Sequence, residues 1–248
     1  MADIEKFRGA LHGSACGDAL GYPLQNFSVG RIQRRFGPFG LRTLVRDARN
    51  GRKAPISDNT QMILATIDGI LWADAKKLDL VDGIYRGYMR WYYSQTGEEP
   101  RRGQRTWMRR QPHEREFCLV REKFMHARRS PEEGLLGAFS KDVKGSTKVK
   151  VNDCRGSAAL ARAIPIGLIF AGDSKAAFDE GVKAAALSHS DPVGYCSLLF
   201  CSIFRMPRFL CSFSLRFLQC SFCILSCSFL SVYYGWQNAV LQKVVFWL

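Results

Sequence analysis

Apolar residues recur every three to four positions along most of residues 1–197, whereas alternation with a period of two is almost absent. Phe7, Leu11 and Ala15, for example, lie at four-residue steps on one face of a helix predicted over residues 4–16. Long helices joined by short or medium loops predict an all-α protein. The same spacing predicts further helices at residues 28–35, 57–70, 79–95, 116–127, 131–139, 158–170 and 174–187.

Glycine, proline and polar stretches mark the connections between these helices. Two glycines and a proline within residues 17–23 predict a turn after the first helix. Pro165 is expected to kink or end its helix, because proline lacks a backbone N–H. In the Arg-rich loop at 98–115, His113 has no obvious partner. Loops are also predicted at residues 46–55 and 141–150.

Residues 198–248 differ in composition from the rest, and we therefore divide the chain into a domain at 1–197 and a divergent tail at 198–248. The tail contains no Asp or Glu and is rich in Phe, Cys and Ser. Its uncharged run, residues 217–235, could just cross a bilayer, which needs about 20 apolar residues, but Gln219 and several serines weaken that interpretation.

The tail has two other interpretations. Phe, Leu, Ser and Cys share pyrimidine-rich codons, so a frameshift or retained intron would give this composition. We favour that interpretation over a packed apolar terminus, and a membrane anchor is the least favoured of the three.

Charge and cysteine usage bound the function further. The chain has 36 Lys and Arg against 22 Asp and Glu, and its net charge of +14 favours a polyanionic partner. Its nine cysteines are an odd number, which argues against a secreted disulfide framework, and no His follows His189 to complete a zinc site in the tail. The N-terminus begins with charged residues and lacks the apolar core of a signal peptide. We therefore expect a cytoplasmic protein with free thiols.

Two polar groups at the ends of predicted helices could carry chemistry. Asp18 lies between two glycines, with Gln25 beyond it; glycines let the backbone approach a ligand, although Gly-Asp pairs are also common turns. Ser57 to Gln61 places consecutive oxygen-bearing side chains at a helix start. Capping needs only one of them, and the remaining oxygens would suit Mg²⁺.

A third polar group, residues 152–157, opens an Ala-rich helix. It contains Arg155, Gly156 and Ser157, and the free N–H groups at such a helix start can bind phosphate. A simple helix cap with close packing by alanines is the alternative.

In this order and spacing, these stretches resemble the ADP-ribosylglycohydrolases, the family that includes the enzyme that reactivates dinitrogenase reductase. The resemblance covers about residues 5–197. It rests on four stretches: GALHGSACGDALGYP at 9–23, ISDNTQM at 56–62, RGSAALARAIPIG at 155–167 and SHSDP at 188–192.

The resemblance implies an orthogonal multi-helix bundle that is incomplete at its C-terminus. It implies hydrolysis of the bond between ADP-ribose and a modified arginine, serine or small acceptor, with two Mg²⁺ ions, or Mn²⁺, in a central cleft. It also implies catalytic roles for Asp58, Asn59 and Gln25 and metal-ligand roles for Ser57, Asp58 and Asn59. The residues that it implies for substrate binding are Asp18, Arg155, Gly156, Ser157 and His189.

Three departures from the family pattern weaken the implied chemistry. Gln25 stands where a glutamate is common, and an amide cannot act as a base. Asn59 replaces a frequent aspartate, which removes one charge from the cation site. The family's second, aspartate-rich cluster has no counterpart, because no Asp or Glu follows Asp191. Binding of Mg²⁺ depends on ligand charge, so the second ion is doubtful and we expect weak or no turnover.

Two other functions are compatible with the sequence. A catalytically dead module would keep the phosphate loop and His189 and bind ADP-ribose without cleaving it. A nucleic-acid binder would use the Arg pairs of residues 101–129 with Trp107, since arginine and an aromatic ring can contact phosphate and stack on bases. We do not expect the second, because charged loops are usually solvated surface, and we expect a monomer that binds neither nucleic acid nor membrane.

Overall fold

The computed structural model describes residues 4–47, 53–141, 143–156 and 158–196, and in this part of the chain helices dominate and no strand occurs. The chain divides into two units, residues 1–57 with 206–248, and residues 58–205. The all-α prediction is confirmed. The tail at 198–248, with its run at 217–235, lies outside the described residues, and none of the described helices has the length and apolarity that a bilayer span requires.

The first unit contains helices α1 (Ile4–Gly21) and α2 (Val29–Phe36) with the 3-10 turn η1 (Tyr22–Leu24) between them. Phe7, Leu11 and Ala15 are buried along α1, as their spacing predicted. The turn predicted for 17–23 begins later, because α1 continues to Gly21 and η1 then starts at Tyr22, with Pro23 in its first turn. A glycine inside a helix costs only about 1 kcal/mol, which burial of its neighbours outweighs.

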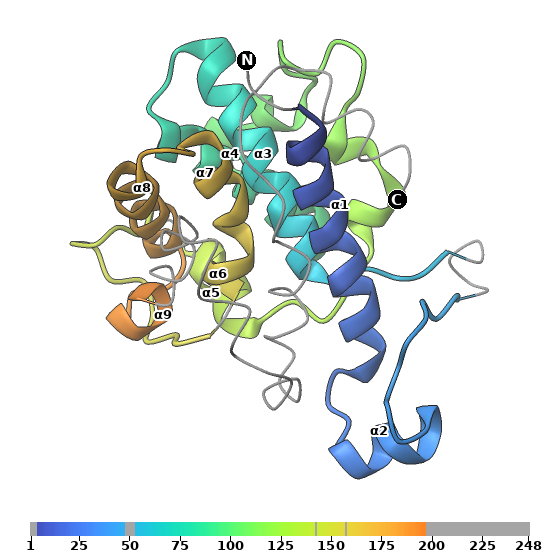
Figure 1. Cartoon of the computed structure of the whole chain (residues 1–248). Coiled ribbons are helices and arrows are strands. Elements are labelled where there is room, and N and C mark those ends of the chain that lie inside the picture. Colours follow the sequence, from blue (N-terminus) through green and yellow to red (C-terminus); the bar gives the residue numbers. More distant parts are fainter. Residues whose placement is uncertain (1–3, 48–52, 142, 157, 197–248) are drawn as a thin grey trace. The chain divides into compact units, whose positions relative to one another are not determined.

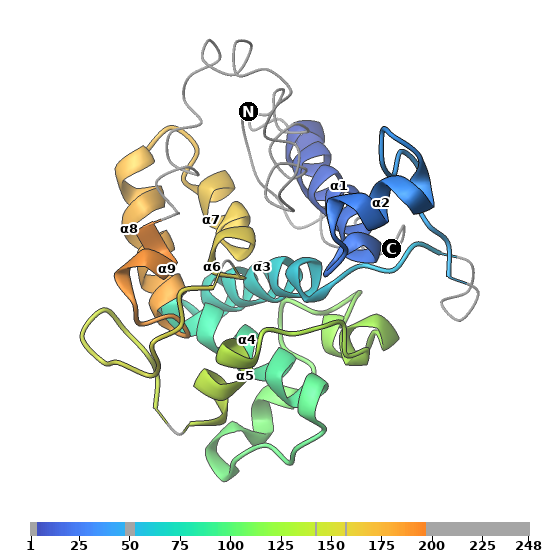
Figure 2. The ribbon, with the colours of Figure 1, turned by 90° about the horizontal axis from the view of Figure 1, so that it is seen from below.

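Helices α3 (Asp58–Lys76) and α4 (Leu80–Thr96) form the centre of the second unit and pack along one another (Figures 1 and 2). Nearly all of α3 is buried. A Cβ added at Gly69 would overlap the Cα of Ile84, and one added at Gly87 would overlap the carbonyl oxygen of Ala65. The two backbones therefore touch where these glycines meet, which makes their contact closer than side chains would allow.

Five shorter helices surround this pair. Helices α6 and α7 pack against α3, whereas α5 and α8 pack against α4, and α9 lies on α6 and α8 (Figure 2). The break predicted at Pro165 is confirmed, since α6 ends at Arg162 and α7 begins with this proline in its first turn. The bounds are α5 (Glu133–Ser140), α6 (Ala158–Arg162), α7 (Ile164–Ile169), α8 (Ser174–Ala186) and α9 (Pro192–Cys196).

The helix predicted over 116–127 is wrong. This segment forms the 3-10 turns η4 (Leu119–Arg121) and η5 (Lys123–His126), and a further turn, η3 (Arg102–Met108), lies in the predicted Arg-rich loop. The carbonyl groups of Phe124 and Met125 accept hydrogen bonds from side chains of α3 and α4. Tertiary bonds thus take acceptors that a regular helix would have used.

Replacement of Gly87 by alanine tests the close contact of α3 with α4. We expect Gly87→Ala to lower the free energy of unfolding by about 1–3 kcal/mol, because the added methyl group forces the helices apart. Gly137→Ala in α5 is the control, since its Cβ would meet no atom within 4 Å, and alanine is favoured over glycine in helices. Urea unfolding of both variants gives the measurement, and equal stability of Gly87→Ala and the parent would contradict the contact.

Candidate functional site

Asp18 and Ser57 lie together in the first unit although they are far apart in sequence. The backbone N–H of Ser57 donates to one carboxylate oxygen of Asp18 at 2.8 Å, and its hydroxyl donates to the other at 2.6 Å. Both side chains are buried. A hydroxyl that donates its proton keeps its lone pairs, so the Ser57 oxygen is still able to accept from another group or a cation. Gln25 is exposed and follows η1 in the same unit.

The first turn of α3, in the second unit, is held by the irregular segment that precedes α5. The N–H of Asp58 donates to the carbonyl of Arg129 at 3.2 Å, and the Gln61 amide donates to the carbonyls of Phe124 and Ala127. Asp58 is buried and Asn59 half-buried. The same segment continues to Glu132, whose carboxylate contacts Cys154 and His189.

Two of the sequence motifs, at 152–157 and 188–192, form one structural element. The N–H of Val151 donates to the Ser190 hydroxyl at 2.7 Å, and the Asn152 amide donates to the Ser188 carbonyl at 2.8 Å. Arg155 forms an ion pair with Asp191 at 2.7 Å. Ser157 lies outside the described residues. The fold thus brings together Arg155, Gly156 and the His189 segment.

Glu132 occupies the centre of this loop pair. The Cys154 thiol donates to one oxygen of Glu132 at 2.8 Å, and His189 Nε2 lies 3.7 Å from the other. A Cβ added at Gly156 would overlap the same carboxylate. From the sequence we expected the N–H groups of the 152–157 segment to bind phosphate; in the structure, the anion against Gly156 is the carboxylate of Glu132.

Burial and hydrogen bonds shift the ionisation of this cluster. The neighbouring His189 imidazole lowers the pKa of Glu132 to about 2 against the opposing effect of burial, and the Cys154 thiol contributes to the lowering. Burial lowers the pKa of His189, so the imidazole is neutral at pH 7. Hydrogen bonds held by the Glu132 carboxylate are complete above its ordinary pKa and are lost as pH falls towards about 2.

Arg162 is a buried cation beside His189. Its Nη2 donates to the Ser188 hydroxyl at 2.5 Å and lies 3.2 Å from His189 Nδ1, while its guanidinium carbon lies 5.0 Å from the centre of the Tyr88 ring. Burial lowers the pKa of Arg162. Sequence analysis assigned no role to Arg162 or Glu132, because neither residue type is unusual at its position in the sequence.

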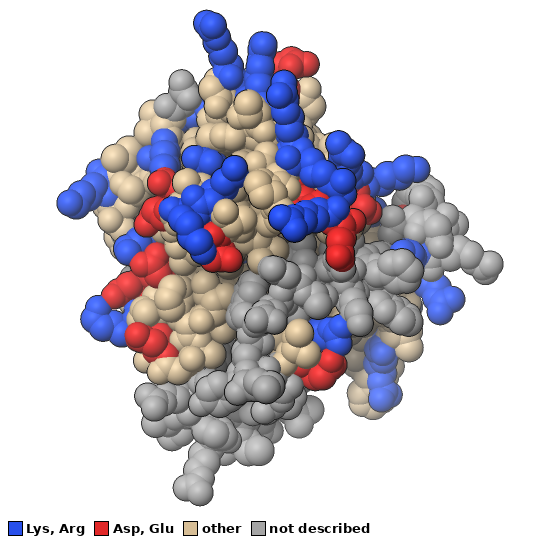
Figure 3. Space-filling model, turned by 90° about the horizontal axis from the view of Figure 1, so that it is seen from above, with Lys and Arg blue, Asp and Glu red and all other residues tan. Residues whose placement is uncertain are grey.

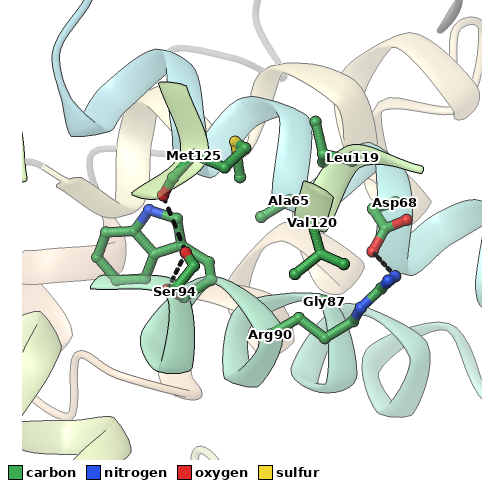
Figure 4. A pocket seen from close by; sticks show the side chains of 9 residues that line it. Ala65, Asp68, Gly87, Arg90, Ser94, Leu119, Val120 and Met125 are labelled. Atoms are coloured by element: carbon green, nitrogen blue, oxygen red, sulfur yellow. Dashed lines mark hydrogen bonds and ion pairs between the residues drawn. The ribbon is translucent and has the colours of Figure 1, made fainter. Parts of the chain in front are cut away.

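A second buried ionic group joins α3, α4 and the Arg-rich loop. Arg90 donates to Asp68 at 2.9 Å and to Glu114 at 3.0 Å, beside the small pocket drawn in Figure 4. His113 Nε2 lies 2.8 Å from Asp68, so the expectation that His113 lacks a partner is wrong. Arg90 binds both carboxylates and offsets one of their two negative charges, so this group links α3, α4 and the loop through buried ionic hydrogen bonds.

Trp107, the aromatic residue of the Arg-rich loop, takes part in packing within the second unit. Trp107 packs edge-on against Trp72, with ring centres 6.3 Å apart, and the Arg86 guanidinium lies over both rings. On the face shown in Figure 3, acidic side chains lie among the projecting Lys and Arg. The aromatic ring is thus used in packing and the surface charge is mixed.

The donors at the start of α3 agree only in part with the Mg²⁺ site that the resemblance implies. Ser57, Asp58 and Asn59 offer oxygen atoms alone, which is the chemistry that Mg²⁺ prefers. Among the described residues, however, neither group of three clustered His, Cys, Asp or Glu ligands includes Asp58. The oxygen donors of Ser57, Asp58 and Asn59 thus suit a hard cation such as Mg²⁺, but they supply only one negative charge to bind it.

A family model described as ADP-ribosylglycohydrolase matches residues 1–206. The chain therefore belongs to the ADP-ribosylglycohydrolase family, which consists of hydrolases that act on ADP-ribosylated substrates. A search of curated proteins found no match to the chain. The resemblance drawn from the four sequence stretches is confirmed.

Removal of the Asp68 charge tests the second ionic group. Burial raises the pKa of Asp68, but the charge of Arg90 and the hydrogen bond with His113 outweigh it, so the net shift is downward. Its stabilisation is therefore complete above the unfolded value of about 3.9 and is lost as pH falls below it. We expect Asp68→Asn to cost about 3–5 kcal/mol at pH 7 and to flatten the acid limb of the stability curve.

The matched control is Asp74→Asn on the same helix, because the Asp74 side chain is 77% exposed. Removal of the Asp74 charge is expected to change the free energy of unfolding by less than about 1 kcal/mol. Denaturant unfolding between pH 3 and pH 8 measures both variants. A parallel pH dependence of Asp68→Asn and the parent would show that the ion pair does not control acid stability.

Proposed function

We propose that this protein is a metal-dependent hydrolase that cleaves the glycosidic bond between ADP-ribose and a modified protein side chain or small acceptor. The observation that carries the proposal is the hydrogen-bonded pairing of the 151–156 and 188–191 loops around buried His189. Both loops carry stretches by which the sequence resembles the family, and their contact supports a common substrate site. The net charge of +14 also favours an anionic substrate such as a diphosphate.

In this proposal, His189 and Arg155 contact the ADP-ribose moiety. A neutral imidazole can donate one hydrogen bond at pH 7, and the lowered pKa of His189 supports that role. Arg155 is exposed and paired with Asp191, so a phosphate would compete with a carboxylate for the guanidinium. Gly156, Ser157 and Asp18 complete the proposed substrate residues.

Ser57, Asp58 and Asn59 would hold Mg²⁺ or Mn²⁺, and Asp58 would stabilise positive charge at the ribose C1″. Departure of the acceptor builds oxocarbenium-like charge there, which a nearby carboxylate stabilises. When bound, a divalent cation orients hydroxyl groups and activates water. Gln25 can hydrogen-bond the ribose but cannot take a proton. With few carboxylates to hold the cation, turnover is slow.

The other attributes of the proposed enzyme follow from its thiols and charge. Cys16, Cys118 and Cys154 are free cysteines, which suits a reducing compartment such as the cytoplasm. We propose that the protein acts there as a monomer. We do not propose nucleic acid or membrane as partners.

A second candidate function is an ADP-ribose-binding module without turnover. Two observations favour it: hydrogen bonds join the loop pair around His189, whereas among the described residues neither cluster of three His, Cys, Asp or Glu ligands includes Asp58. The two candidates share the ligand and differ only in cleavage.

Release of free ADP-ribose from an ADP-ribosylated protein distinguishes these candidates. We expect slow release in Mg²⁺, reduced at least about a hundredfold in Asp58→Ala, because the carboxylate acts on the reacting bond. His189→Ala should mainly weaken ADP-ribose binding. His126→Ala is the control, since this histidine is exposed and binds the Val120 carbonyl.

The outcomes separate the two functions. Binding of ADP-ribose without release by the parent chain would support the binding module. Neither binding nor release would overturn both candidates.

Isothermal titration with Mg²⁺ tests the explanation for slow turnover. Because the donors carry a single carboxylate, we expect binding in the millimolar range or weaker, and loss of the heat signal in Asp58→Ala. Micromolar affinity in the parent chain would show that the missing acidic cluster is not limiting.

A further inference from the structure

Three side chains of different chemistry converge in the second unit. A carboxylate oxygen of Glu132, the sulfur of Cys154 and a ring nitrogen of His189 all lie within 4.8 Å of one another. Thiolate, imidazole and carboxylate are the ligand types of zinc sites, whereas Mg²⁺ and Mn²⁺ prefer oxygen. This cluster thus has different chemistry from the oxygen donors at the start of α3.

One atom of the cluster has no partner. His189 is fully buried, and its Nε2 lacks a hydrogen bond although it faces Glu132. A buried polar atom without a partner costs about 1–3 kcal/mol, so its position requires an explanation. A bound cation at the point shared with Glu132 and Cys154 would satisfy it.

The surrounding backbone makes room for the converging side chains. A Cβ added at Gly134 would lie 2.7 Å from the Cys154 sulfur, and one added at Gly156 would overlap Glu132. Two glycines thus line the cluster where any side chain would displace a ligand.

The other ring nitrogen of His189, Nδ1, has a hydrogen-bond partner of the kind found behind metal-binding histidines. His189 Nδ1 lies 2.9 Å from the Ser188 hydroxyl, and ligating histidines commonly donate their other N–H to an oxygen. Arg162 Nη2, which can only donate, lies 3.2 Å from the same Nδ1 atom and favours the other tautomer in the metal-free ring. In the tautomer in which Nδ1 donates to Ser188, the lone pair of Nε2 faces Glu132 and Cys154, and metal binding selects this tautomer.

We propose that Glu132, Cys154 and His189 form a zinc-binding site, with a fourth position open to water. On binding, the Cys154 S–H bond breaks, its proton passes to solvent and a Zn–S bond forms; no oxidation is involved. Glu132 is already ionised, and the imidazole binds as the neutral ring. Arg162 adds a positive charge beside the ring and lowers the affinity below that of a site with the same ligands and no cation.

Zinc at this site blocks the hydrolase, an effect that rests on the proposed function. The ion takes the Nε2 atom with which His189 would contact ADP-ribose and places a metal against the Gly156 turn. We therefore expect that Mg²⁺, bound at the start of α3, supports turnover, and that Zn²⁺, bound at the cluster, inhibits it.

Cobalt is a spectroscopic probe of this site in the full chain. We expect Co²⁺ to give a thiolate-to-metal charge-transfer band that Zn²⁺ displaces. Cys154→Ser should remove the band and weaken zinc binding at least about a hundredfold. Loss of a residue that only hydrogen-bonds to a ligand already weakens metal binding about 10- to 100-fold, and loss of the ligand itself should cost more. Glu132→Gln should weaken binding while retaining the thiolate band.

Controls separate this site from the other thiols. Cys16→Ser leaves the cluster intact and should keep the band, as should the triple variant Cys220→Ser, Cys223→Ser and Cys227→Ser. Circular dichroism checks that each variant folds. An unchanged band in Cys154→Ser, or no zinc binding by the parent chain, would overturn the proposal. Zinc binding by a chain that never releases ADP-ribose would instead refute the hydrolase and leave the site in place.

Discussion

The direct backbone contact between α3 and α4 is the constraint on which the second unit depends. Because the helices touch at Gly69 and Gly87, α3 has almost no surface left for water. Every polar group on it then requires a partner within the protein. Thr66 meets the Tyr88 hydroxyl at 2.9 Å, Asp68 meets Arg90, and Gln61 accepts from the Trp91 indole at 3.0 Å.

These polar contacts also place the functional loops. Gln61 donates to the carbonyls of the irregular segment before α5, which fixes that segment across the first turn of α3. The chain then runs three residues from Arg129 to Glu132, whose carboxylate organises the Cys154 and His189 loops. Hydrogen bonds from a single buried helix thus position residues that are far apart in sequence.

Local patterns in the sequence predicted the helices well, because burial of one apolar face decides most of them. The α1 stripe, the start of α3 and the break at Pro165 were all readable from spacing or from proline chemistry. The helix expected over 116–127 was not, since long-range bonds to Gln61, Ser94 and Gln95 take its carbonyl groups. No local pattern records that competition.

In the candidate site, too, some residues were identifiable from the sequence, whereas others depend on long-range contacts. Its motif residues were identifiable because their types and order resemble a family, and the structure joins two of those motifs. Glu132 and Arg162 were missed, because a glutamate at a helix start and an arginine in a helix are ordinary in isolation. Their significance comes from their meeting at His189, which depends on tertiary structure.

Arg162 also influences which molecules the loop pair can accept. Its guanidinium is almost fully enclosed, and the charge of Glu132 acts on it to raise its pKa against the effect of burial. In a medium of low permittivity, an enclosed cation attracts negative charge far more strongly than it would in water. A visiting group that displaced the carboxylate without carrying charge itself would leave that cation uncompensated. Arg162 thus favours a negatively charged group over a neutral one in its surroundings.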